Sequence, residues 1–452
     1  MDPLQYDGRV RAQYETLPYP MRMPADEPHR LLTSWLDDLP MINHYCCRGR
    51  RDLARGFRAL VAGGGTGDAT IHLAEQLRVS GAEVTHLDIS ASSMEIARER
   101  ARVRGLRNVN WLHASVLDLP RLGLGKFDYI NCSGVLHHLE EPDQGLAALA
   151  SALGDHGALA IMVYGQYGRT AVYPTQDLMR RVVGDEPDIA KKIGIAKAVL
   201  AVLPPTNWWK RGEPQDASQP VSEMDDAEIY DVFLHSRDRA YTVPELSEWM
   251  EKGHGLHLHF TDVMRGRSPY MVEKYLAPGQ EALLERVKRF PEREQHAIAE
   301  LFGGDIYTHS FYATREPDTA ASPDDLDNVP FFFHEPVTGA FFHDVLSRAP
   351  GDALSLPHAH SGFVVRLARG RYLKDVFKHI DGERPLREIF DRVRTEPEHR
   401  SAPPSDAVLS AEFRPAFEAL NAIDRLLLRH RSVPRCKTLD ELHAQMHARQ
   451  GK

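Results

Sequence analysis

The glycine-rich stretch at residues 60–77, LVAGGGTGDATIHLAEQL, contains residues suited to binding a nucleoside. It places Gly63, Gly65 and Gly67 in a turn, where a missing Cβ permits positive φ angles and close approach of a ligand. The amphipathic run that follows predicts a helix whose first N–H groups can face a polar or anionic group. About twenty residues further on, a second apolar run ends in Asp88, whose carboxylate can accept both ribose hydroxyls.

The elements that must position these residues alternate between strands and helices. Apolar runs predict strands at residues 57–62, 83–88, 109–113, 127–132 and 158–164. Amphipathic segments between them predict helices, and Ser90 and Gly105 suit the two ends of the second one. This alternation predicts an α/β fold, with a parallel sheet covered by helices on both faces.

Three segments in this order resemble the class I S-adenosylmethionine (SAM)-dependent methyltransferases. They are residues 61–67, LDIS at 87–90, and GKFDYINCSGVLHHLEEP at 125–142. The nearest local likeness is to the quinone-biosynthesis type, which also has a His-His pair before a proline. The resemblance covers residues 57–165 and, through strand order, extends to about residue 315. It implies a Rossmann-like class I methyltransferase sheet, an antiparallel last strand preceded by a helix, and SAM as the cofactor.

The resemblance also implies positions for the cofactor contacts. The glycine turn would lie under the methionine moiety, Asp88 would bind the ribose, and Ile89 would pack on the adenine. Val61 departs from the family pattern, because an acidic residue usually stands two positions before the first glycine. The predicted cofactor-binding residues are Gly63, Gly65, Gly67, Asp88, Ile89, Ser115, Val116 and Ser133.

The acceptor end of the site is expected near His137, His138 and Tyr164, which are the predicted catalytic residues. A histidine can act as a general base, and the family places this pair near the acceptor. The alternative is that one histidine packs and the other caps a helix. Tyr164, Tyr167, Arg169 and Tyr173 form a cluster that suits an aromatic or anionic acceptor, or else packs against an inserted subdomain. His235 and Tyr241 are further candidates for the acceptor site.

The chain divides into six predicted parts. The Pro- and Tyr-rich beginning suggests a lid over the site or, alternatively, an arm covering an apolar edge. Together with the extra carboxy-terminal domain, it is similar to multidomain bacterial methyltransferases. The parts are an amino-terminal arm or lid (1–56), the SAM-binding Rossmann-like core (57–165), an inserted helical substrate subdomain (166–253), completion of the core sheet (254–315), an acidic linker (316–330), and a small, mostly helical, winged-helix-like accessory domain (331–452).

Composition narrows the class of protein further. The 452 residues include 55 Lys and Arg against 64 Asp and Glu, a formal charge of −9 that argues against a nucleic-acid partner. The four cysteines are too few for a disulfide framework, and the amino terminus lacks the apolar core of a secretory signal, so we expect a cytoplasmic protein. We expect no membrane span and no metal site, because the paired histidines at 257/259 and 358/360 lack further ligands.

The sequence therefore predicts a SAM-dependent methyltransferase that acts on a small organic molecule. One alternative is a protein or peptide methyltransferase that recognises its substrate through the carboxy-terminal domain. Another is a non-catalytic SAM-binding protein that interacts with a partner. The sequence leaves open whether the chain forms a homodimer.

Overall fold

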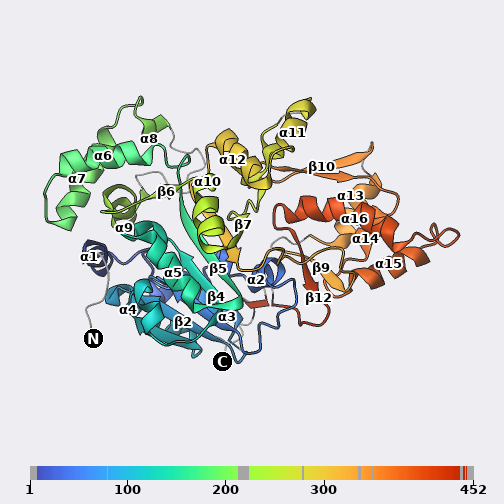
Figure 1. Cartoon of the computed structure of the whole chain (residues 1–452), viewed down its shortest axis with the longest axis horizontal. Helices are drawn as coiled ribbons and strands as arrows, with labels where there is room; N and C mark the ends of the chain where they lie inside the picture. The colour runs from blue at the N-terminus through green and yellow to red at the C-terminus, as the bar shows by residue number, and fades with distance from the viewer. Residues whose placement is uncertain are drawn as a thin grey trace.

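A central β-sheet organises the computed structural model, which describes residues 8–78, 80–211, 223–276, 279–333, 337–348, 351–437, 441–442 and 444. The strand order is β3-β2-β1-β4-β5-β8-β7, and β6 pairs with β5 (Figure 1). Strands β1 to β5 run parallel, whereas β8 is antiparallel to both of its neighbours. The strands are β1 (Arg58–Ala62), β2 (Glu83–Asp88), β3 (Val109–His113), β4 (Phe127–Ser133), β5 (Leu153–Gly165), β6 (Ala240–Tyr241), β7 (His257–Thr261) and β8 (Thr308–Thr314).

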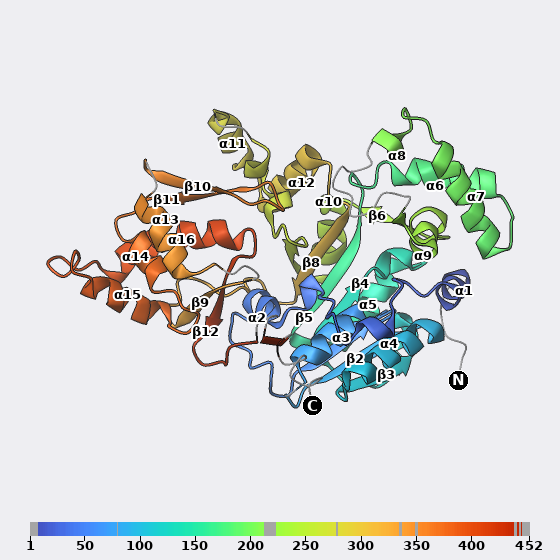
Figure 2. The same ribbon diagram turned by 180° about the vertical axis from the view of Figure 1, so that it is seen from behind.

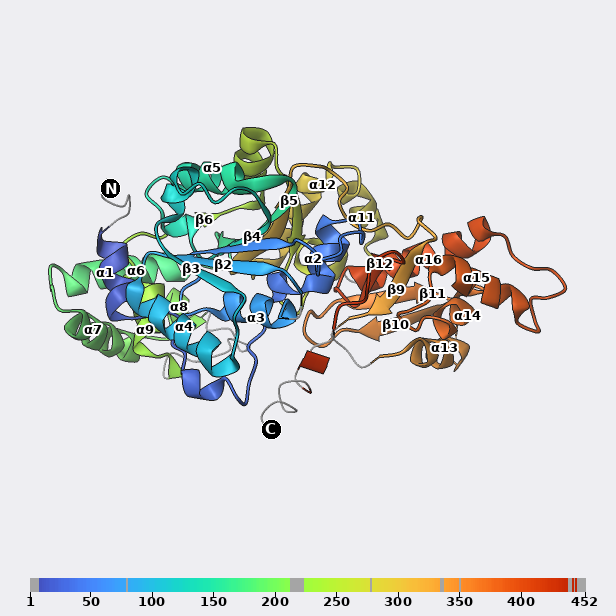
Figure 3. The same ribbon diagram turned by 90° about the horizontal axis from the view of Figure 1, so that it is seen from below.

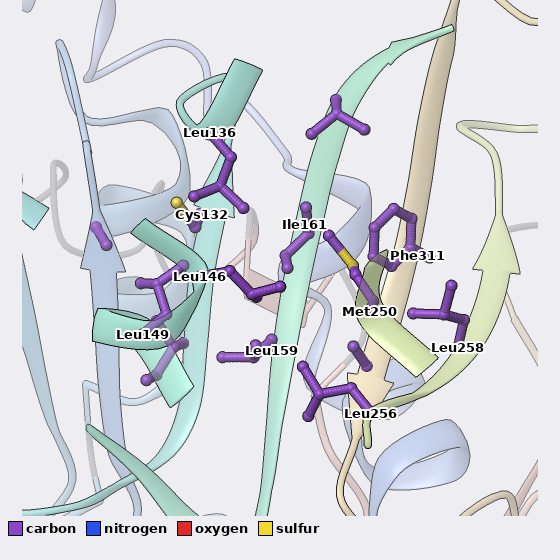
Figure 4. Packing of buried hydrophobic residues seen from close by; sticks show 14 of the residues in the cluster. Cys132, Leu136, Leu146, Leu149, Leu159, Ile161, Met250, Leu256, Leu258 and Phe311 are labelled. Carbon is purple, nitrogen blue, oxygen red and sulfur yellow. The ribbon is translucent and has the colours of Figure 1, made fainter. Parts of the chain in front are cut away.

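Helices cover both faces of this sheet, which confirms the predicted α/β fold. Figure 4 shows one face, where Leu146 and Leu149 of α5 pack on β4 and β5, and Met250 packs near β8. On the other face, seen from behind in Figure 2, α2 and α3 cover β1 and β4. The helices of the arm and core are α1 (Gly8–Thr16), η1 (Pro24–Asp26), η2 (Trp35–Asp37), α2 (Leu39–Cys46), α3 (Asp68–Gln76), α4 (Ala91–Arg104), η3 (Val116–Arg121), η4 (Leu136–His138), α5 (Pro142–Ala152), α10 (Val243–Leu246), η7 (Ser247–Lys252), η8 (Ser268–Tyr270), η9 (Val272–Lys274), α11 (Glu281–Val287) and α12 (Glu292–Gly303).

Local sequence chemistry fixes the ends of the helices that border the site. The Ser90 hydroxyl oxygen accepts the Ser93 N–H at 3.1 Å and begins α4, as predicted. Gly105 ends this helix with a φ of +65°, a left-handed conformation that favours glycine. Gly67 precedes α3 with a φ of +102°. The chain therefore enters both helices at defined points directly after β1 and β2.

A group of helices is inserted between β5 and β7. It comprises α6 (Val172–Val183), α7 (Ile189–Val202), α8 (Trp208–Arg211), α9 (Asp226–Ile229) and the π-helix η6 (Tyr230–Leu234). Met179, Ile193, Leu200 and Phe233 form its small apolar core. Figures 1 and 3 show these helices beside α1, at the opposite end of the molecule from the carboxy-terminal elements.

The carboxy-terminal elements form a second, mainly helical unit with its own apolar core. The predicted linker at 316–330 is packed against α2, because the Ala321 N–H donates to the His44 carbonyl and the Arg48 N–H donates to the Thr319 carbonyl. Residues 1–7 at one end of the chain, and 438–440, 443 and 445–452 near the other, lie outside the described residues, and the domain boundaries stay predictions. The elements are β9 (Asn328–Phe332), α13 (Gly339–Arg348), β10 (Ala353–Pro357), β11 (Val364–Ala368), α14 (Leu373–Lys378), α15 (Leu386–Thr395), α16 (Asp406–Asn421) and β12 (Leu426–His430).

A buried carboxylate joins this unit to the central sheet. Asp424 is fully buried and accepts hydrogen bonds from the Tyr45 hydroxyl, from the Thr261 hydroxyl at 2.9 Å and from the Trp35 indole N–H at 3.3 Å. Burial raises the pKa of this carboxyl. Its three donors come from the amino-terminal segment and from β7, so one side chain connects three distant parts of the chain.

Within the described residues, no helix combines the length and the apolar character that a membrane crossing needs.

Replacing Asp424 by alanine should lower the free energy of unfolding by about 3 kcal/mol, because buried donors lose their acceptor. Chemical denaturation measures this change. Asp324→Ala is the control, since it removes an exposed ion pair with Arg414 and an exposed hydrogen bond from the Ser322 hydroxyl, and it should cost less than about 1 kcal/mol. Equal stabilities of the two variants would contradict the assigned role of Asp424.

Candidate cofactor and active site

A cavity of about 720 Å³ opens at the carboxyl ends of the parallel strands. This is where ligands bind in open α/β sheets, because the loops that follow β1, β2 and β4 converge there. The volume lies within the range of pockets that hold small molecules. The core residues that line it include Val61, Gly63, Gly64, Gly65, Asp68, Leu87, Asp88, Ile89, Ala114, Ser115, Val116, Leu117, Asn131, Ser133, Gly134, Val135, His138, Leu139, Glu140, Glu141, Gln144 and Met162.

The glycine turn forms one wall of this cavity. The N–H groups of Gly63 and Gly64 both donate to the Leu87 carbonyl, at 2.7 and 3.1 Å, which ties the turn to β2. Gly63 has a φ of +76°, and a Cβ there would lie 2.3 Å from a methyl group of Val135. Gly67 does not line the cavity, because it packs against Ala97 of α4 instead. Gly64, which the sequence analysis did not select, does line it.

Asp88 is fixed at the end of β2 by two backbone N–H groups. One carboxylate oxygen accepts the Gly65 N–H and the other accepts the Ser90 N–H, both at 2.7 Å. Burial raises the pKa of this carboxyl. Each carboxylate oxygen can accept more than one hydrogen bond, so the group faces the cavity as an oriented acceptor for a diol. This geometry fits the ribose of SAM.

Apolar side chains line the cavity next to Asp88, where the resemblance places the adenine. Ile89, Val116 and Leu117 line this part of the cavity. Ser115 lines it too, but its hydroxyl oxygen accepts the Leu117 N–H at 3.2 Å and thereby caps η3. The Asp118 carboxylate completes this capping box by accepting the Ser115 N–H at 3.0 Å. Sequence spacing located this segment but could not show that Ser115 and Asp118 pair with each other.

The carboxylate of Asp68 stands near the predicted methionine end of the cavity, where residue 61 offers no acid. Val61 lines the cavity, and so does Asp68, directly after the glycine turn. Arg22 pairs with Asp68 at 2.7 Å, as does Arg100, and their charges lower the pKa of this carboxyl despite its burial. Asp68 therefore stays ionised, and the sequence analysis missed it because its position does not match the family's acid.

The amino-terminal arm lies over the glycine turn. Tyr14, Tyr19 and Pro20 line the cavity, and the Thr66 hydroxyl donates to the Pro20 carbonyl at 2.7 Å. The Glu15 carboxylate accepts the N–H groups of Ala91 and Ser92 at 3.1 and 3.0 Å, at the start of α4. These hydrogen bonds lower the pKa of Glu15 to about 2, although partial burial opposes them.

Of the three predicted catalytic residues, His138 lines the cavity and His137 and Tyr164 do not. His137 is buried and stacks on Tyr164 with ring centroids 3.9 Å apart, and burial lowers the pKa of its imidazole well below the ordinary value. The Tyr164 hydroxyl donates to Asp231 at 3.1 Å. Both residues therefore pack behind His138 and support the cavity wall that His138 forms.

The inserted helices contribute the remaining groups at this end. Asp231 of η6 accepts the Tyr14 hydroxyl at 3.0 Å as well as that of Tyr164, and so joins the arm to β5. His235 stacks on His138 with centroids 3.8 Å apart. The sequence offered His235 as a candidate, whereas nothing in its local pattern distinguished Asp231.

Comparisons with known proteins agree with this geometry. Residues 60–159 match a family model described as a methyltransferase domain. The chain is 32% identical over 311 residues to the uncharacterized protein syc1184_c of a Synechococcus strain, covering 68% of this chain and 72% of that one. It is 29% identical over 121 residues to the ubiquinone/menaquinone biosynthesis C-methyltransferase UbiE of Idiomarina loihiensis, covering 26% of this chain and 46% of the relative.

Among solved structures, PKMT2 from Rickettsia typhi in complex with AdoHcy has a similar fold. The TM-score is 0.58 at 14% identity, covering 88% of this chain and 76% of that one. With the strand order and the cavity, these matches define a class. The chain belongs to the class I SAM-dependent methyltransferases, and SAM is its cofactor.

Replacing Asp88 by alanine should weaken SAM binding by about 1.5–3 kcal/mol, because charge-assisted hydrogen bonds to the ribose are lost. Isothermal titration calorimetry measures this change. Glu83→Ala, at the exposed start of the same strand, is the matched control and should bind SAM normally. Unchanged affinity in a folded Asp88→Ala protein would remove Asp88 from the cofactor site.

Replacing Glu15 by alanine should speed dissociation of SAM about fivefold, because the arm loses its attachment to α4. A chase of labelled SAM with unlabelled SAM gives the rate. Because the folded pKa of about 2 lies below the ordinary 4.5, the attachment is fully present above about pH 4.5 and weakens as the pH falls toward 2. Arg11→Ala removes a partly exposed ion pair with Glu15 but keeps the Glu15 carboxylate, and it should change little. Identical rates of SAM dissociation in the wild type, Glu15→Ala and Arg11→Ala would show that the arm does not hold the cofactor.

Proposed function

We propose that the chain transfers the methyl group of SAM to a small organic molecule. The observation that most supports this proposal is that His138 lines the same cavity as Asp88. The cavity therefore extends from the predicted cofactor contacts to a candidate base. The arm and the segment around Asp231 cover that end, which favours an acceptor that fits inside the cavity over a large surface.

The protein's part in such a reaction is mainly alignment and exclusion of water. SAM, when bound, supplies a methyl group on a sulfonium, which is a reactive electrophile. Val135, Leu139 and Met162 give the acceptor end an apolar lining. His138 is the residue there that can accept a proton from the acceptor.

The size class of the acceptor can be tested with methyl-labelled SAM. The chain is incubated with a cell extract that has been separated into a low-molecular-mass filtrate and a macromolecular fraction. We expect labelled product in the filtrate, made by the wild-type chain and by Glu83→Ala but not by Asp88→Ala. Label in the macromolecular fraction alone would indicate a protein or peptide acceptor instead. Tight SAM binding without transfer to either fraction would indicate a non-catalytic SAM-binding protein.

A further inference from the structure

The charge of the cavity limits which acceptors can enter it. Among the described residues that line it, the ionisable side chains other than His138 and the two tyrosines are acidic: Asp68, Asp88, Glu140 and Glu141. No lysine or arginine side chain lines it in that set. A carboxylate or phosphate acceptor would therefore be desolvated without a compensating cation, which is costly.

The sequence predicted Arg169 as a cation near the acceptor. In the structure its side chain forms contacts outside the cavity lining. Its guanidinium is fully buried, pairs with Asp238 at 2.7 Å and lies 3.6 Å from the centroid of the Tyr164 ring. Tyr173 also donates to Asp238, at 3.2 Å. This cluster packs the inserted helices against β5, so an anionic acceptor gains no partner from it.

The peptide groups on either side of Arg237 determine where two imidazole protons lie. The Arg237 carbonyl lies 2.8 Å from Nδ1 of His138. Because a carbonyl can only accept, Nδ1 of neutral His138 holds the proton and Nε2 has a free lone pair. The Arg237 N–H donates to Nδ1 of His235 at 3.1 Å, so the proton of neutral His235 is on Nε2. His138 is thus the proton acceptor of the pair.

The same arrangement disfavours a metal ion at this cluster. A ring nitrogen of His138, one of His235 and a carboxylate oxygen of Asp231 lie within 4.8 Å of one another. However, Nε2 of neutral His235 holds a proton, and the two Asp231 oxygens already accept the hydroxyls of Tyr14 and Tyr164. The hydrogen bonds of this cluster therefore go to the Arg237 backbone and to two tyrosine hydroxyls, which leaves no ready set of ligands for a metal ion there.

We infer that the acceptor atom is the oxygen of an uncharged hydroxyl group on a small apolar molecule. This inference rests on the proposed function, and it assigns that function a substrate class. A hydroxyl offers the proton that Nε2 of His138 can take. An uncharged molecule that bears this hydroxyl suits the apolar walls of the cavity. An ammonium group is less suited, because Glu140 and Glu141 are exposed and Asp231 already has two partners.

The proposed transfer to the hydroxyl oxygen conserves atoms, protons and electrons. The O–H bond breaks and its proton moves to Nε2 of His138, while the oxygen forms a bond to the methyl carbon. The S–CH₃ bond breaks, and the sulfur keeps the electron pair and loses its positive charge. His138 then returns the proton to solvent.

The test uses the labelled product recovered from the filtrate. Hot hydriodic acid, under conditions that leave N-methyl and C-methyl groups intact, releases the methyl of an ether as volatile iodomethane. We expect the label to become volatile with acid and to resist mild alkali, which would release methanol from a methyl ester. Label that stays bound, or that alkali releases, would overturn the inference while leaving the proposed function intact. No labelled filtrate product at all would overturn both.

A variant tests the role of His138 separately. His138→Ala should bind SAM normally and lose about 10²- to 10⁴-fold in transfer rate to this product, the range for loss of a general base. Added imidazole should restore part of the rate, which a merely structural role would not allow. His156→Ala, at an exposed histidine, is the control and should behave as wild type with and without imidazole. Full activity of His138→Ala, or a loss that imidazole does not repair, would contradict the role of His138 as the base.

Discussion

The hydrogen bonds of the Asp88 carboxylate are the interaction on which the site depends. One oxygen is bonded to the glycine turn after β1 and the other to the start of α4 after β2. Two neighbouring parallel strands therefore end in loops that are held together by one side chain. Burial keeps water from competing for these bonds, although it raises the pKa of the carboxyl. The same carboxylate is thus a structural link and the best candidate for ribose binding.

Asp231 has a corresponding role at the acceptor end. It accepts a hydroxyl from the arm and another from β5, so the arm, the sheet and the inserted helices meet at one buried residue. His235, four residues later, stacks on His138. The inserted helices therefore help to define the shape of the acceptor end, where the proposed chemistry takes place. In the proposed arrangement the predicted cofactor contacts come from the core, and the predicted acceptor contacts depend on the segments added to it.

The carboxy-terminal unit is attached by the same kind of contact. Asp424 accepts donors from η2, α2 and β7, and the segment at 316–330 is hydrogen-bonded to the region of α2. These contacts lie on the sheet face that α2 covers, away from His138. The structure thus places this unit against the core, and none of its described residues lines the cavity.

The sequence by itself determined the alternation of strands and helices, the glycine turn, Asp88 and the caps of α4. These features follow from local rules: apolar periodicity, the φ freedom of glycine, and a serine that satisfies free N–H groups. Tertiary structure alone decided that Arg169 is sequestered by Asp238, that the Tyr164 hydroxyl bonds to Asp231, and that the Arg237 carbonyl fixes the proton of His138. Those outcomes depend on which groups lie opposite one another after folding, 60 to 100 residues apart in sequence, and hydrogen-bond partners at such separations leave no local pattern.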